Sequence, residues 1–139
     1  MTYANFTPTA PSTDIRYMED AERKIQGKVW NLDAIQAALA AGQLEIIVAP
    51  SANEGIELLN WGSNHLRAFV QALSKARYYD SEWCRFNPKS NVYACDTYVM
   101  GYSKSLTSEN PKARPWVYFK FTIFHKGLLV IRAHEETRG

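Results

Sequence analysis

Two spacings of hydrophobic residues divide the chain. Between residues 31 and 76, apolar side chains recur every three or four positions, whereas from residue 77 onward they tend to alternate with polar ones. The first spacing is typical of helices that bury one face, and the second is typical of half-buried strands. Because the helical part comes first, the pattern predicts an α+β fold with N-terminal helices packed on an antiparallel sheet.

Three helices and one short strand are predicted before residue 77, at residues 31–42, 44–48, 51–62 and 63–76. In the first helix, Asn31 can cap the start and Gly42 can adopt the left-handed conformation at the end. The second helix is expected to begin at a Ser/Asn cap and to close near Gly62. The third has its apolar residues on one face: Leu66, Phe69, Val70 and Leu73.

The remaining chain is predicted to be mostly extended. Strands are expected at residues 77–86 and 92–100, with a turn between them at residues 87–91. A long polar loop at residues 103–115 then leads into a C-terminal β-hairpin, residues 117–134.

The turn of this hairpin decides which side chains share a face. A two-residue turn would place two charged side chains of the return strand among the phenylalanines, where an unpaired charge is strongly disfavoured. A three-residue turn at residues 125–127 pairs Phe124 with Leu128 and puts Gly127 in the left-handed position. We therefore expect the three-residue turn, which places every apolar residue of the hairpin on one face.

The opposite face of the hairpin then gathers polar side chains: Tyr118, Lys120, Thr122, Arg132 and His134. In this register Lys120 lies opposite Arg132, and Tyr118 lies opposite His134. Two cations directly opposite repel unless an anion or a carboxylate lies between them. Two interpretations remain open: an ordinary solvated sheet face, or an anion site with a phenol and an imidazole suited to phosphoryl chemistry on RNA.

Length and composition suit one packed domain, residues 1–139, because 46% of the residues are apolar and 13% are aromatic. Residues 1–28 are expected to be an extension, which starts as a loose arm and enters a short helix after residue 14. No apolar run approaches the ~20 residues that cross a bilayer, and no secretory pattern is present. Two cysteines cannot make a disulfide framework, so free thiols and a cytoplasmic location are expected.

The net charge of +2 conceals an uneven distribution. Residues 1–75 carry 6 Lys or Arg against 8 Asp or Glu, a charge of −2, whereas residues 76–139 carry 10 against 6, a charge of +4. A basic second half can attract phosphate groups electrostatically. Ordinary scatter of charged residues is the other interpretation.

Five stretches of sequence follow one another in a familiar order: "LDAIQAALAAGQL", "AFVQALSKARYYDS", "CDTY", "VYFKFTI" and "LLVIRAHEE". In this order they resemble the motility quorum-sensing regulator (MqsR) toxins, which are RelE-like ribonucleases of type II toxin–antitoxin systems. The resemblance covers about residues 31–136 and leaves the N-terminal thirty residues unmatched. It implies a RelE-like arrangement of helices on an antiparallel sheet that ends in a β-hairpin.

The resemblance also implies an activity, which is cleavage of messenger RNA without a metal or a cofactor. A ribose 2′-hydroxyl attacks the adjacent phosphate and leaves a cyclic phosphate and a 5′-hydroxyl. The family's catalytic Tyr matches Tyr118, and its C-terminal Lys falls on His134, which titrates nearer neutrality. Lys120 and Arg132 are then expected to hold the phosphate. RNA and a cognate antitoxin protein are the implied partners.

Two positions depart from the family's pattern. Asp80 stands where the family has a Lys, and Cys95 stands where it has a Gln. A RelE-like module that has lost its chemistry and binds RNA or a protein is therefore the alternative function.

Asp96 and Tyr98 share one face of their strand and are the remaining expected contributors to RNA binding. Both are expected to hydrogen-bond to the basic patch, or Asp96 is the carboxylate that separates Lys120 from Arg132. Cys95 points to the other face and is expected to be an inert, buried thiol.

No metal site is expected, because Cys84, Cys95, His125 and His134 lack the spacing of zinc ligands. His65 is expected to have a structural role. The tryptophans are expected in the core or at its rim: Trp30, Trp61, Trp83 and Trp116.

Overall fold

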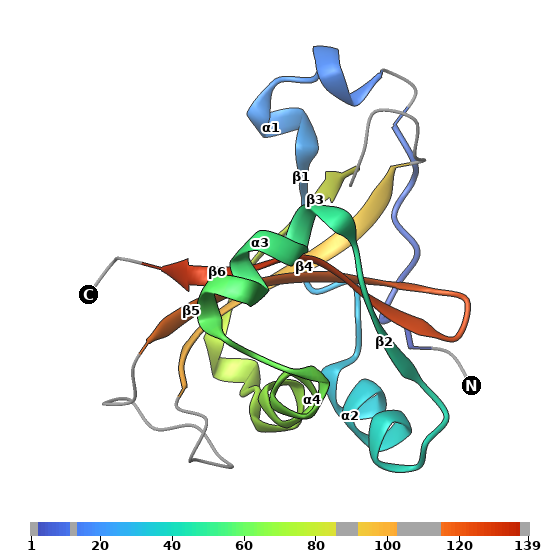
Figure 1. The fold of residues 1–139 in the computed structure, drawn as a ribbon. Helices are drawn as coiled ribbons and strands as arrows, with labels where there is room; N and C mark the ends of the chain where they lie inside the picture. Colours follow the sequence, from blue (N-terminus) through green and yellow to red (C-terminus); the bar gives the residue numbers. More distant parts are fainter. Residues whose placement is uncertain (1–2, 12–13, 86–91, 103–114, 137–139) are drawn as a thin grey trace.

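The computed structural model describes residues 3–11, 14–85, 92–102 and 115–136. Within these ranges, helices and one six-stranded sheet form an α+β fold (Figure 1), as the order of the two hydrophobic spacings predicts. None of the described helices is long and apolar enough to cross a membrane. The predicted turn at residues 87–91 and most of the predicted loop at 103–115 lie outside the described residues.

The sheet is antiparallel except at one edge. Its strands lie in the order β1-β3-β4-β5-β6-β2, and β2 runs parallel to β6. The strands are β1 Lys24–Ile25, β2 Glu45–Val48, β3 Tyr78–Cys84, β4 Tyr93–Gly101, β5 Trp116–Phe124 and β6 Gly127–Glu136. The predicted extended segments at 44–48, 77–86 and 92–100 are confirmed as β2, β3 and β4.

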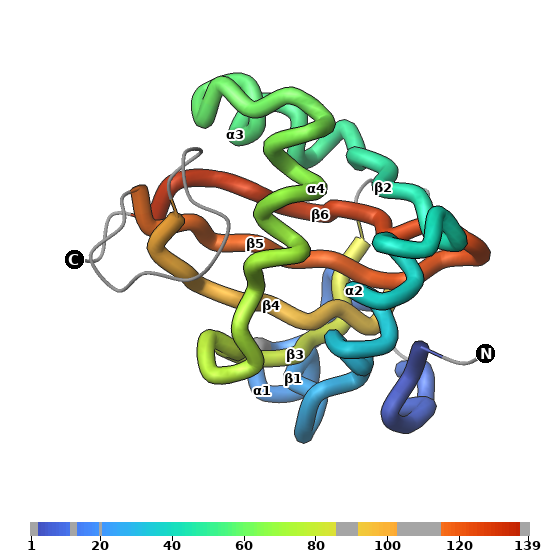
Figure 2. The backbone as a smooth tube through the Cα atoms, turned by 90° about the horizontal axis from the view of Figure 1, so that it is seen from below, coloured from blue at the N-terminus to red at the C-terminus, as the bar shows by residue number. Residues whose placement is uncertain are grey.

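Two helices cover one face of this sheet. The helices are η1 Ile15–Tyr17, α1 Asp20–Arg23, α2 Leu32–Ala40, α3 Pro50–Leu59, α4 Ser63–Ala72 and η2 Lys75–Arg77. Figure 2 shows α4 running across β6, β5 and β4 with α2 beside it. Figure 1 shows α1 on the side of the sheet away from α2 and α4. We call the surface under α2 and α4 the helix face.

The main core lies between the helix face and these two helices. Phe69 of α4 is at its centre, with ring centroids 5.0 Å from Trp61, 5.2 Å from Tyr102 and 5.2 Å from Phe119. Aromatic pairs at this distance add to the stability that apolar burial provides. The apolar stripes predicted for α2 and α4 are therefore confirmed as core positions.

The predicted ends of α2 are confirmed. The Asn31 side chain accepts a hydrogen bond from the Ala34 amide at 3.1 Å, and Gly42 has a φ of 72° just after the helix. An N-cap oxygen and a left-handed glycine satisfy backbone groups that the helix leaves unpaired.

The predicted start of α3 and the predicted end of α4 are wrong, whereas α4 starts at Ser63 and α3 closes near Gly62 as expected. No side chain caps α3, which begins at Pro50, because the fixed φ of proline suits the first helical position. It ends at Asn60, which has a left-handed φ of 57°, before Gly62. The helix predicted at 63–76 stops at Ala72, because Ser74 accepts from the Ala76 amide and starts the separate turn η2.

The N-terminal extension belongs to the sheet rather than being loose. Ala4 bridges Trp30, and the Asn5 amide donates to the Val29 carbonyl at 2.7 Å. Further along the chain, β1 pairs with β3. The expectation of a loose arm is therefore wrong for residues 3–5, and the expectation of a short helix after residue 14 is confirmed by η1 and α1.

The turn between β5 and β6 differs from its prediction. It has two residues, His125 and Lys126, and pairs Phe124 with Gly127. His125, not Gly127, takes the positive φ, at 56°. A β-bulge between Lys120 and Phe121 then shifts the register by one residue.

The bulge compensates for the shorter turn, so two of the predicted cross-strand pairs still form. Lys120 lies opposite Arg132 and Tyr118 lies opposite His134, so these two predictions are confirmed. The prediction that every apolar residue lies on one face is wrong, because Leu129 and Ile131 pack with Cys95 away from the helix-face core.

Candidate functional site

The candidate site occupies the side of the sheet opposite the helix face, which we call the polar face. Strand alternation and the observed registers bring side chains from four strands onto it. Its polar members are Asp80, Glu82, Thr97, Tyr118, Lys120, Thr122, Arg132 and His134.

Tyr118 and His134 form a stacked pair on the polar face. Their ring centroids are 4.9 Å apart and their planes differ by 12°. Both residues are half-buried. The His134 Nδ1 atom lies 3.0 Å from the Glu135 carbonyl oxygen. A phenol and an imidazole held side by side can exchange protons with a ligand.

Lys120 lies next to this pair but is not a free cation. Its residue is only 5% exposed, its Nζ atom lies 5.6 Å from the centroid of the Tyr118 ring, and it makes an ion pair with Glu82. Glu82 also lies 3.6 Å from Nζ of Lys24, which in turn pairs with Asp80. Four alternating charges thus cross the polar face and largely neutralise one another.

Asp96 and Tyr98 do not lie on the polar face, so their predicted contact with the basic patch is wrong. The β4–β5 register places Asp96 opposite Phe121 and Tyr98 opposite Phe119, which belong to the core under the helix face. The prediction that Asp96 and Tyr98 share a face is confirmed, but Glu82, not Asp96, is the carboxylate that neutralises Lys120.

Asp96 instead holds the chain that precedes α2. Its carboxylate accepts hydrogen bonds from the amides of Val29 at 3.1 Å and Trp30 at 2.9 Å, and from the Ser81 hydroxyl at 2.6 Å. Burial raises the pKa of the Asp96 carboxyl, and these hydrogen bonds oppose the rise. Burial likewise raises the pKa of Tyr98, and the nearby Asp96 charge adds to this effect. Neither group lies on the polar face.

Arg132 is an exposed cation of the polar face. Its guanidinium has no ion pair or hydrogen bond within the part of the chain that the structure describes. It also lines a cavity of about 430 Å³ that lies between the polar face and the N-terminal segment. The cavity therefore lies near the Tyr118–His134 pair, because His134 is two residues beyond Arg132 on β6.

Basic side chains dominate the lining of this cavity. They come from three parts of the chain: Arg16, Arg23, Arg85, Lys120 and Arg132. Glu82 is the carboxylate among the lining residues. We call this space the arginine cavity. The sequence pattern gave no sign of Arg16, Arg23 and Arg85 as site residues, because no motif connects residues of the extension with the end of β3.

Contacts with the N-terminal segment hold three of these arginines in place, Arg16, Arg23 and Arg85. Asp14 accepts two hydrogen bonds from the Arg16 guanidinium, at 2.9 and 3.2 Å, and lies 3.8 Å from that of Arg85. The hydrogen bonds from Arg16 lower the pKa of Asp14 to about 2. Arg23 donates through Nη2 to the Ile15 carbonyl at 2.9 Å.

Cys84 and Cys95 form a disulfide that joins β3 to β4 beside the arginine cavity. The expectation of free, inert thiols is therefore wrong. The two cysteines stand on adjacent strands and on the same side of the sheet, a placement that depends on the β3–β4 register and is not visible in their spacing alone.

Other candidate residues have structural roles. His65 accepts a hydrogen bond from the Gly62 amide at 3.1 Å, at the start of α4. Trp61 is in the core, and Trp30 donates to the Ala94 carbonyl at 2.9 Å from the core's rim. These findings confirm the structural expectation for His65, Trp61 and Trp30.

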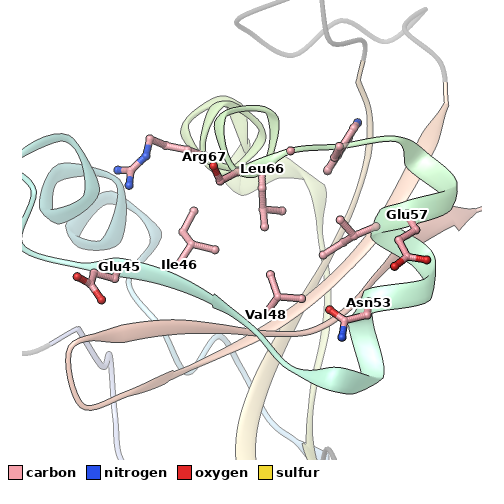
Figure 3. A pocket seen from close by; sticks show the side chains of 11 residues that line it. Glu45, Ile46, Val48, Asn53, Glu57, Leu66 and Arg67 are labelled. Atoms are coloured by element: carbon pink, nitrogen blue, oxygen red, sulfur yellow. The ribbon is translucent and has the colours of Figure 1, made fainter.

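A second cavity, of about 500 Å³, lies between β2, α3 and α4. Figure 3 shows Ile46, Val48 and Leu66 pointing into it, with Glu45 and Glu57 at its rim. None of the residues predicted to act on RNA lines it. Its apolar floor suits packing better than phosphate chemistry, so we place the candidate site on the polar face.

No protein-family model matches the chain, and no curated protein matches it either. Function is therefore inferred from the polar face. It presents one stacked phenol–imidazole pair, Tyr118 and His134, with the cation Arg132 beside it on β6. Among the described residues, no group of three or more His, Cys, Asp or Glu side chains could hold a metal ion.

Proposed function

We propose that this protein is a toxin-like endoribonuclease of the RelE-like, MqsR-like kind that cleaves messenger RNA without a metal. The observation that carries the proposal is the stacking of Tyr118 on His134, 4.9 Å apart, on a face that also exposes Arg132. The pairing of these strands in a C-terminal hairpin on an α+β fold supports the proposal as well.

In the proposed reaction, a ribose 2′-oxygen bonds to the adjacent phosphorus and the bond from phosphorus to the 5′-oxygen breaks. Tyr118 and His134 act as the acid–base pair: one accepts the 2′-hydroxyl proton and the other donates a proton to the departing 5′-oxygen. Arg132 stabilises the charge that develops on the phosphate oxygens. The products are a cyclic phosphate and a 5′-hydroxyl.

Lys120 takes a different part from the one that its sequence position predicts. Because Glu82 neutralises it and it is buried, we assign phosphate contact to Arg132 and give Lys120 a positioning role under the Tyr118 ring. Its ion pair connects β5 to β3 across β4 and so holds the strand that carries Tyr118.

The proposal is tested by incubating the purified protein with long RNA in EDTA and detecting fragments with 5′-hydroxyl ends. Removal of one proton-transfer group is expected to slow cleavage by about 10²–10⁴-fold, so Tyr118→Phe and His134→Ala should each be nearly inactive. His125→Ala is the matched control, because His125 is an exposed imidazole in the adjoining turn. Unchanged cleavage by the Tyr118→Phe/His134→Ala double variant would refute the proposal.

The second candidate function is a binding module without chemistry. The carboxylates Asp80 and Glu82 favour it, because they neutralise Lys24 and Lys120 where a phosphate would otherwise be attracted. In the same experiment, RNA that is retained by the wild-type protein but stays intact would support this module.

A cognate antitoxin is part of the first proposal, because a free ribonuclease of this kind would arrest the cell that makes it. The antitoxin is expected to cover the polar face. Expression of the wild-type chain alone should stop growth, whereas expression of the His134→Ala variant should not.

A further inference from the structure

We infer that the arginine cavity is a second phosphate subsite, which holds a backbone phosphate of the same RNA strand outside the reacting nucleotide. This inference rests on the proposed function for its ligand. It adds residues of the N-terminal extension to the RNA-binding surface, and the resemblance to the toxin family does not reach that part of the chain.

The charge of the lining favours an anion. Five basic side chains line the cavity, and Glu82 is the carboxylate that faces them. Glu82 already pairs with Lys120 and lies near Lys24, and Asp14 offsets part of the charge of Arg16 and Arg85. A net positive charge therefore remains, and the forked guanidinium groups match the oxygens of a phosphate.

Two guanidiniums have hydrogen-bonding capacity that the described chain does not use. Arg132 makes no ion pair or hydrogen bond within the described ranges, and Nε of Arg23 is buried there without an acceptor. Buried donors are nearly always satisfied in folded proteins. A phosphate oxygen in the cavity would accept from the exposed Arg132 guanidinium, whereas Nε of Arg23 would be reached only after the Arg23 side chain moves.

The position of Arg132 connects the cavity to the proton-transfer pair. Arg132 and His134 are two residues apart on one side of β6, which corresponds to about 6.6 Å along a strand. A single strand of RNA whose reacting phosphate lies at Tyr118 and His134 therefore passes Arg132 before it reaches Arg16 and Arg85.

The inference is tested with an uncleavable probe, a fluorescent 2′-O-methyl RNA dodecamer, whose binding to the full chain is followed by anisotropy in EDTA at several salt concentrations. The variant is Arg16→Gln/Arg85→Gln. Loss of charge-assisted hydrogen bonds is expected to weaken binding about tenfold per guanidinium. The slope of log affinity against log salt should fall by about 0.7 for each lost phosphate contact.

Arg67→Gln is the control for the loss of one guanidinium, to be set against the effect per guanidinium of the double variant, because it removes a charge from α4, on the helix side of the sheet, and should leave affinity and slope unchanged. Circular dichroism and thermal melting of each variant show whether it is folded. If the double variant does not fold, Arg16→Gln alone gives the test. The contacts of Arg16 are with its neighbours Asp14 and Tyr17, so their loss should not unfold the chain.

The outcomes separate this inference from the proposed function. A lower affinity and slope for the cavity variant support the subsite even if the wild-type protein cleaves no RNA, in which case only the enzymatic proposal fails. Wild-type affinity and slope in a folded cavity variant overturn the subsite even if cleavage is intact. Displacement of the probe by poly-glutamate as readily as by unlabelled RNA also overturns it, because the cavity would then fit an acidic protein.

Discussion

At the scale of single residues, the role of a carboxylate in this protein is decided by the face on which its side chain lies. Asp96 and Glu82 are both acidic and stand on adjacent strands, yet Asp96 holds backbone amides in the core and Glu82 neutralises Lys120 on the polar face. The alternation of residues along one strand shows which side chains share a face, but it does not show which face of the sheet that is. The absolute assignment requires the register with the neighbouring strand.

The role of Asp96 predicts a loss of stability on Asp96→Asn. One of its two oxygens becomes an NH₂ group that cannot accept from the backbone amides or from Ser81, and a buried unsatisfied donor costs about 2 kcal/mol. Urea unfolding measures this difference in the free energy of unfolding. Glu135→Gln, an exposed change of the same kind, is the control.

The effect of this substitution should also depend on pH. Burial raises the folded-state pKa of Asp96 above its unfolded value, so between these two pKa values the folded protein binds more protons than the unfolded chain. The contribution of Asp96 to stability is therefore complete below the unfolded pKa and is lost as pH rises through the folded pKa. The stability difference between the wild-type protein and the Asp96→Asn variant should therefore be larger near pH 4 than at pH 7. A larger stability difference at pH 7 than near pH 4 would mean that the hydrogen bonds lower the pKa of Asp96 by more than burial raises it.

The ion pair of Lys120 predicts a contrast between two neighbouring carboxylates. Glu82→Gln leaves a buried ammonium without its counter-charge and should lower the free energy of unfolding by about 3 kcal/mol. Asp80→Asn removes a pair with Lys24, whose side chain is 44% exposed, and should cost about 1 kcal/mol or less. Equal losses for the two variants in urea unfolding would contradict the positioning role of Lys120.

At the scale of elements, the close contact between α3 and β6 fixes the strand that carries His134. A Cβ atom added at Gly55 would overlap the Ala133 carbonyl oxygen and would lie 3.0 Å from Cβ of His134. The helix can therefore approach the strand only because residue 55 has no side chain. Ser51 adds a hydrogen bond of 2.7 Å to the Ile131 carbonyl at the bulge.

Gly55→Ala should accordingly push α3 away from β6. The overpacking is expected to outweigh the better helix propensity of alanine and to lower stability by about 2 kcal/mol. It should also lower RNA cleavage, because His134 moves with β6. Gly62→Ala is the control: the nearest atom to its added Cβ is 3.9 Å away, and its effect should stay below about 1 kcal/mol. A thermal melt and the cleavage assay measure both effects.

The elements themselves were largely predictable from sequence, whereas several of their ends and part of their packing were not. The 3.6-residue spacing and the Asn31 and Gly42 signals are local, and they locate α2 correctly. The bulge near Lys120 arises from long-range pairing, so the hairpin's face assignment failed for Leu129 and Ile131 although its polar pairs were right. Helix ends at Asn60 and Ala72 depend on backbone conformations that several residue types can adopt.

At the scale of the whole molecule, the candidate site is assembled from both ends of the chain. The pairing of Tyr118 with His134 was predictable, because both belong to one hairpin. The arginine cavity was not, because Arg16 and Arg23 meet Arg132 only after the N-terminal extension has folded against the sheet. Sequence spacing carries no information about such a contact.

The disulfide supports this assembly and gives a further prediction. Cys84 and Cys95 are separated by 11 residues, and closing a loop of that size stabilises a fold by about 2–3 kcal/mol in the chain-entropy description. Cys84→Ser/Cys95→Ser should lower the free energy of unfolding by that amount. Thiol titration of the denatured wild-type protein should find no reactive thiol before reduction and two after it. A thiol that reacts before reduction would show that the pair is open.

The parallel contact between β2 and β6 has a consequence for synthesis on the ribosome. β2 leaves the exit tunnel early, but the strand that it pairs with is the last of the sheet to be translated. Until then the sheet on which α2 and α4 bury their apolar stripes is incomplete, so the nascent chain is expected to need protection from aggregation. Under the proposed function, the chain would also remain harmless to the messenger RNA that encodes it until β6, which carries His134, has emerged.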